Sequence, residues 1–237
     1  MIKYAFISLL FSSSLFAVAE INPPSGFIAL FNGENLDGWW GAKTEDPSSW
    51  EKMDPKKFSQ KKKASLKDIN THWKAENGVL INDGNGLFLT TEQFFADFEL
   101  RLAYKTVAKA DSGVYLRGVP QVQIWDTTKE GGKWKYGAAK GSGGLWNNGS
   151  SSVPGRDPLV HADKPFGEWN QLNIEMTGDK VTVILNQKLV VDGSPLVNYW
   201  DRRTPANKRK PLISKGPIQL QTHGGEICWR NIYLKEL

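Results

Sequence analysis

Polar side chains suited to acid–base chemistry gather in the segment Asp111–Asp126, which reads as two antiparallel strands joined by a tight turn. Side chains alternate between the two faces of a strand. Tyr115 and Arg117 are therefore expected on one face, with Gln121 and Gln123 beside them on the facing strand. The segment predicts a polar sheet face that could bind a substrate.

Asp126 is the one carboxylate at the end of the second strand, and its spacing from Gln123 would place it on the opposite face. One β-bulge between these two residues would return the carboxylate to the polar face, and bulges often lie beside active sites. With the bulge, Arg117, Gln121, Gln123 and Asp126 would converge. The alternative is a half-exposed sheet face with ordinary polar residues.

A second candidate stretch is Gly216–Glu226, in which Gln221 and His223 share a strand face. Gly224 and Gly225 allow the backbone to turn directly after the histidine, which would expose its ring. A histidine in that position suits general acid–base catalysis near neutral pH. The other two histidines lack such a setting, and no pair of histidines has the spacing of metal ligands.

The loop from Lys133 to Asn148 combines glycines, aromatic side chains and amides. Trp134, Tyr136 and Trp146 could stack on a sugar ring, while Asn147 could bond to its hydroxyl groups. An equally open interpretation is a rigid loop held by aromatic anchors. Long irregular segments of this kind in compact domains are often functional.

Alternation of apolar and polar residues dominates after residue 75, as in Phe98–Lys105 and Leu172–Met176. Short alternating runs separated by turn residues predict an all-β sandwich of two antiparallel sheets, of the jelly-roll kind. Asp54–Ile69 is the exception, because it is rich in Lys, Gln and Ala and has Pro55 at a first helical position. We predict that it is a solvent-exposed helix without an apolar stripe, irrelevant to chemistry.

The first nineteen residues read as a signal peptide, because Lys3 and an apolar run precede Ala17-Val18-Ala19. We expect a mature single domain of residues 20–237, without a membrane span, in the periplasm or outside the cell. The net charge of +5 is concentrated in two basic segments. Export favours solvated surfaces there over nucleic-acid binding. The one cysteine, Cys228, permits no intramolecular disulfide and is expected to be buried and inert.

Several stretches resemble the family of 3-keto-disaccharide hydrolases, also described as 3-keto-glucoside lyases or 3-keto-2-hydroxyglucal hydratases. They are Phe27–Trp39, Trp73–Leu80, Asp97–Asp126, Gly167–Asn173 and Gly216–Leu237. The resemblance implies a concanavalin A-like jelly roll. It also implies cleavage of 3-keto-glycosides by elimination at C1–C2 and then hydration. Many members carry an acidic residue at the position of Gln121. In this chain Asp126 is therefore the sole carboxylate of the strand, which argues against a mechanism with two carboxylates.

On this basis Asp126 or His223 would transfer the proton, and Arg117 would hold substrate oxygens as a further catalytic residue. Gln121, Gln123 and Gln221 would hold substrate oxygens. The alternatives are a lectin-like module that binds carbohydrate without catalysis, and a sandwich that binds other proteins. No motif requires a cofactor, and the sequence leaves the metal requirement and the oligomeric state open.

Overall fold

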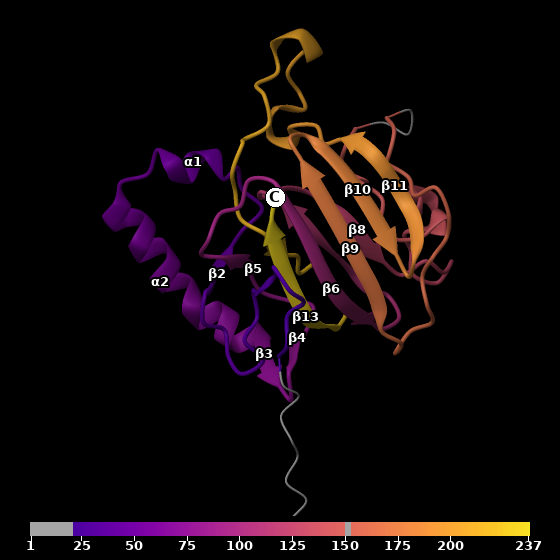
Figure 1. The fold of residues 1–237 in the computed structure, drawn as a ribbon, viewed down its shortest axis with the longest axis horizontal. Coiled ribbons are helices and arrows are strands. Elements are labelled where there is room, and N and C mark those ends of the chain that lie inside the picture. The colour runs from indigo at the N-terminus through magenta and orange to yellow at the C-terminus, as the bar shows by residue number, and fades with distance from the viewer. Residues whose placement is uncertain (1–20, 150–152) are drawn as a thin grey trace, which may run out of the picture.

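The computed structural model describes residues 21–149 and 153–237, and the predicted signal peptide lies outside these residues. Two antiparallel sheets pack face to face, which confirms the predicted all-β sandwich (Figure 1). The eight-stranded sheet has the order β11-β10-β9-β6-β13-β4-β3, with β1 also paired to β13. Its strands are β1 (Ile28–Ala29), β3 (Trp73–Glu76), β4 (Val79–Asn82), β6 (Phe98–Thr106), β9 (Asn170–Thr177), β10 (Lys180–Leu185), β11 (Lys188–Pro195) and β13 (Ile227–Glu236).

The five-stranded sheet has the order β2-β5-β12-β7-β8 and carries the site. Its strands are β2 (Trp39–Ala42), β5 (Phe88–Thr91), β7 (Asp111–Leu116), β8 (Val119–Trp125) and β12 (Gln219–Leu220). Val114, Val122 and Leu220 point into the core between the sheets. The alternate residues of the same strands therefore face away from the core, where a polar surface can form.

Helices α1 (Ser48–Glu51) and α2 (Pro55–His72) lie on the side of the sandwich away from β9–β11 (Figure 1). The side chain of Asp54 caps α2 by accepting hydrogen bonds from the backbone N–H groups of Lys56 and Lys57. The predicted helix is confirmed, but the expectation that it lacks an apolar face is wrong. Ile69 is fully buried in the main core, and Phe58 packs against the aromatic cluster at β2.

Four 3₁₀ turns lie in the long connections: η1 (Trp134–Tyr136), η2 (Ala138–Lys140), η3 (Tyr199–Asp201) and η4 (Ala206–Lys208). The first two belong to the loop after β8, and the last two to the loop between β11 and β12. Each of these loops borders the outer face of the five-stranded sheet. In the described residues, no helix is long and apolar enough to cross a membrane.

Candidate active site

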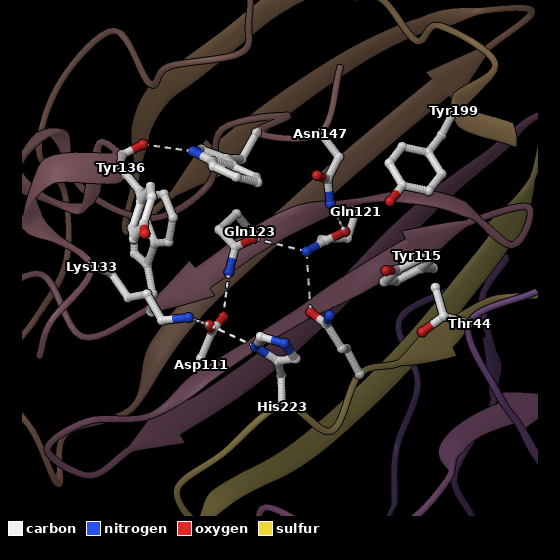
Figure 2. Close-up of a pocket in the computed structure, with 13 residues that line it drawn as sticks. Thr44, Asp111, Tyr115, Gln121, Gln123, Lys133, Tyr136, Asn147, Tyr199 and His223 are labelled. Carbon is white, nitrogen blue, oxygen red and sulfur yellow. Dashed lines mark hydrogen bonds and ion pairs between the residues drawn. The ribbon is translucent and has the colours of Figure 1, made fainter. Parts of the chain in front are cut away.

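A cavity of about 370 Å³ opens on the outer face of the five-stranded sheet, a size within the range of small-molecule sites. Strands β7, β8 and β12 form its floor, and the segment after β2 and the two long loops form its walls. The lining residues are Thr44, Asp111, Tyr115, Gln121, Gln123, Trp125, Lys133, Tyr136, Trp146, Asn147, Tyr199, Gln221 and His223 (Figure 2).

His223 and Asp111 form a candidate acid–base pair in the cavity. Nδ1 of His223 lies 2.7 Å from Oδ2 of Asp111, and Nζ of Lys133 lies 2.7 Å from the same oxygen. The turn after the histidine aligns the pair, because the Asp111 N–H donates to the carbonyl of Gly224 at 2.8 Å. Asp111 is buried, whereas the His223 side chain is 54% exposed, so the ring is open to a substrate.

These contacts shift both pKa values toward the charged forms. The hydrogen bond to Asp111 raises the pKa of His223 above its ordinary value of 6.5, although burial and the nearby Lys133 act against this rise. Burial acts to raise the pKa of Asp111, yet the hydrogen bonds from His223 and Lys133 hold it below its ordinary value. Asp111 therefore stays ionised and accepts the N–H at Nδ1 of the neutral imidazole. That tautomer leaves the lone pair of Nε2 as the basic site.

Carboxamides form a directed hydrogen-bond chain along the floor. Nε2 of Gln123 donates to Oδ1 of Asp111 at 2.8 Å and to two backbone carbonyls, so the orientation of this amide is fixed. Nε2 of Gln121 donates to Oε1 of Gln123 at 2.8 Å and to Oε1 of Gln221 at 3.2 Å. Nδ2 of Asn147 donates to Oε1 of Gln121 at 2.9 Å.

The direction of this hydrogen-bond chain determines which hydrogen-bonding groups on the cavity floor remain free for a ligand. Asp111 can only accept, so the Gln123 amide must donate to it. The oxygen of Gln123 then accepts from the Gln121 amide, and the same Gln121 amide also donates to the oxygen of Gln221. The amide N–H groups of Gln221 therefore find no acceptor among the described residues, and Gln221 lines the cavity together with His223. Gly113 is required beneath the chain, since a Cβ there would lie 2.6 Å from Cγ of Gln121.

Aromatic side chains form two opposite ends of the cavity (Figure 2). At one end Trp146 packs edge-to-face against Trp125 and Tyr136, with centroid distances of 5.9 and 6.5 Å. At the other end lie Tyr115 and Tyr199. Flat apolar faces at both ends and amides on the floor suit a ring that carries hydroxyl groups.

Three of the residues proposed from the sequence lie outside the cavity lining. Asp126 is buried, and its carboxylate accepts from the N–H of Lys109 at 2.7 Å and from the N–H and hydroxyl of Thr128 at 2.8 and 2.7 Å. Burial acts to raise its pKa, but these bonds hold it below the ordinary value. The bulge expected before Asp126 is wrong, because the register of β7 and β8 shifts between Val114 and Leu116 instead.

Arg117 occupies the turn between β7 and β8 with a φ of 54°, so it does not share the face of Tyr115. Its buried guanidinium donates to the carbonyls of Ala96 and Gly178 and pairs with Asp97 at 2.7 Å. It thereby joins the turn to the other sheet. Trp134 is 42% exposed, and Nζ of Lys129 lies 5.7 Å from the centroid of the Trp134 ring.

The structure brings together the other proposed residues, which are His223, Gln121, Gln123, Gln221, Tyr136, Trp146 and Asn147. Sequence reasoning missed Asp111 and Lys133 as site residues. The alternation of side chains along the strand could have indicated Asp111, because Asp111 lies four residues before Tyr115 and so shares its face. Lys133 lies in an irregular loop, and nothing in its spacing indicated the pairing. Within the described residues, no three His, Cys, Asp or Glu side chains cluster in a way that could hold a metal ion.

A β-sandwich with an aromatic and amide-lined cavity is an arrangement expected of a carbohydrate-active protein. Residues 26–235 match the profile of the family described as the 3-keto-alpha-glucoside-1,2-lyase-like domain. The chain belongs to this family, as the sequence resemblance predicted, and it is a glycoside-acting enzyme.

A curated relative, the 3-keto-disaccharide hydrolase of Bacteroides thetaiotaomicron, is 24% identical over 249 residues, covering 90% of this chain and 79% of the relative. Two crystal structures from Parabacteroides distasonis, described as proposed glycosyl hydrolases, share the fold. One has a TM-score of 0.60 and 19% identity, covering 90% of this chain and 94% of that one. The other has a TM-score of 0.58 and 24% identity, covering 89% and 99%.

Proposed function

We propose that this cavity cleaves 3-keto-glycosides by elimination across C1 and C2 followed by hydration, which together amount to hydrolysis. The observation that carries the proposal is the contact between His223 and Asp111, which leaves Nε2 of the imidazole as a base facing the cavity. Among the described residues that line the cavity, Asp111 is the only carboxylate. Ordinary glycoside hydrolysis needs two, so a reaction with a single base fits better.

The ketone at C3 makes such a reaction possible, because it acidifies the proton at C2. In the proposed first step, Nε2 of His223 takes this proton, and the electron pair delocalises into the C3 carbonyl as an enolate. The enolate then expels the oxygen at C1, a C1–C2 double bond forms, and water protonates the departing oxygen while the imidazolium gives the C2 proton up to solvent. In the second step, water adds its hydroxyl to C1 and a proton to C2, and the 3-keto sugar is released.

The free amide N–H groups of Gln221 are placed to stabilise the enolate. Gln221 and His223 line the same cavity, and the chain through Gln121 and Gln123 holds the Gln221 amide in its donating orientation. Fixed donors at a developing negative charge lower the transition-state energy without reorganisation. Lys133 adds a positive charge at the same end of the cavity.

The pH dependence of kcat/KM tests this assignment. Because His223 must be neutral to act as a base, kcat/KM should fall as the pH falls through a pKa that lies above 6.5. Replacing Lys133 by Met removes a charge that lowers this pKa, so the acidic limb should move to higher pH. A pH–rate profile on a 3-keto disaccharide measures both effects, and His223→Gln serves as the control that should lose the limb. An unchanged limb in His223→Gln would assign the base to another residue.

We also propose that the chain is exported and that the mature protein starts at Glu20, on the strength of the Ala17-Val18-Ala19 pattern. Intact-mass measurement of the protein recovered from the periplasm or medium tests this. Retention of residues 1–19 in the exported protein would contradict it.

A further inference from the structure

The loop between β11 and β12 projects from the end of the sandwich beyond the body of the two sheets, and residues 196–216 form most of it (Figure 1). We name it the basic arm, because six of its residues are Lys or Arg and only Asp201 is acidic. The six cationic residues are Arg202, Arg203, Lys208, Arg209, Lys210 and Lys215, and all six are exposed.

The positive charges of the basic arm are not neutralised within the described parts of the chain. None of its Lys or Arg side chains forms an ion pair there, in contrast to Lys61, Lys133 and Lys140, which pair with acids elsewhere. The carboxylate of Asp201 binds the hydroxyl of Thr204 and accepts from the backbone N–H of Lys210. Asp201 therefore shapes the loop, and the field of the cations extends into solvent.

Backbone contacts hold two of the guanidinium groups in place. Arg209 donates from Nε to the carbonyl of Thr204 at 2.9 Å and from Nη2 to the carbonyl of Arg202 at 3.1 Å. Arg202 donates to the carbonyl of Tyr199 at 3.0 Å, and its guanidinium lies 3.6 Å from the centroid of the Tyr199 ring. These contacts reduce the entropy lost when the guanidinium groups bind a ligand.

The basic arm is continuous with the cavity through η3. Tyr199 lines the cavity, and Nε1 of the adjacent Trp200 donates to the carbonyl of Gly118 at 3.2 Å, at the turn of the floor strands. Arg202, stacked on Tyr199, is therefore a cation of the arm in direct contact with the cavity lining. A sugar chain whose one ring lies in the cavity would extend along the arm.

We propose that the basic arm binds carboxylate-bearing sugar units of the substrate, so that the enzyme acts on glycosides of an acidic glycan. The inference rests on the proposed function, because it assumes that the cavity holds the oxidised ring of the same chain. Guanidinium groups match carboxylates in geometry and charge, which favours uronic acid units. The continuity with a carbohydrate cavity favours a glycan over a nucleic acid or a membrane surface.

Binding of an unoxidised galacturonic acid pentasaccharide, compared with its fully methyl-esterified form, tests the proposal without any turnover. The acidic form should bind at least tenfold more tightly, and the difference should shrink as salt rises from about 0.05 to 0.5 M. The triple variant Arg203→Gln, Lys208→Gln, Lys210→Gln should lose about tenfold in affinity. It spares Arg202 and Arg209, which hold the loop. The matched control removes three unpaired charges from α2, by Lys56→Gln, Lys57→Gln and Lys63→Gln, and should bind as the wild type does.

Equal affinity for the acidic and esterified forms, or equal losses in the two triple variants, would overturn the proposal. Tighter binding to duplex DNA or to phosphatidylglycerol vesicles than to the acidic pentasaccharide would also overturn it, in favour of a different partner. Tight binding of the acidic form without turnover of any 3-keto glycoside would support the arm while contradicting the proposed function. Turnover of 3-keto glycosides with no preference for the acidic pentasaccharide would support the proposed function and contradict the proposed role of the basic arm.

Discussion

Replacing Asp111 by Asn is expected to lower kcat on a 3-keto disaccharide by about 10²-fold or more, the usual scale for a positioned acid or base. The carboxylate accepts the Nδ1 proton of His223 and so keeps Nε2 unprotonated. An amide at this position can accept the Gln123 N–H through its oxygen only by turning its own N–H₂ toward His223. Nδ1 would then have to accept, which moves the imidazole proton to Nε2 and removes the base. Steady-state kinetics of the purified variant measure the loss.

The matched control is Asp126→Asn, the same chemical change at the residue that follows β8. Its carboxylate accepts three hydrogen bonds from Lys109 and Thr128 outside the cavity, so the change should cost about 1–3 kcal/mol of stability. Below its Tm, its kcat should stay within a few-fold of the wild type. A large loss of kcat in Asp126→Asn together with full activity in Asp111→Asn would move the proton transfer to Asp126.

The sandwich could be predicted from the sequence because its strands follow simple rules. In β9 every second residue from Asn170 to Thr177 is buried, the pattern expected when one face covers the core. Strand β2 was missed, and all four of its residues are buried: Trp39 lies in the main core, and Trp40 packs with Trp50 of α1 and Phe58 of α2. Continuous apolar runs of this length give no period from which to infer a strand.

The site could be predicted in part for the same reason. His223, Gln121 and Gln123 were found because residue type and strand parity indicated them. Arg117 was misplaced because a turn with positive φ changes the direction of a side chain, and alternation does not anticipate this. Asp126 was assigned to the site on the assumption of a bulge, and Asp111 was not considered. Regular pairing of Asp111 with Trp125 instead places the carboxylate beside His223.

The pairing of Lys133 with Asp111 could not be predicted from local sequence patterns. Lys133 lies 22 positions along the chain from Asp111, in a loop with no regular strand or helix before η1, and the pairing depends on how that loop folds over the sheet. The same holds for Tyr199 and Thr44, which reach the cavity from the arm and from the segment after β2. Contacts made by long loops depend on the tertiary fold, whereas alternation reports only on the strands.

The requirement for a ketone at C3 is the second large effect expected, and it follows from the single carboxylate among the described residues of the cavity lining. Without the ketone, the C2 proton is not acidic enough for an imidazole to remove. The mature protein should therefore cleave a 3-keto disaccharide and leave the matched unoxidised disaccharide intact over the same time.

Incubating residues 20–237 with these two disaccharides in D₂O, and following both by NMR, tests the central claim most directly. We predict release of the aglycone and of a 3-keto sugar that carries deuterium at C2, with no change in the unoxidised disaccharide. Equal cleavage of both disaccharides, or release of a product that retains its original C2 proton, would contradict elimination at C1–C2.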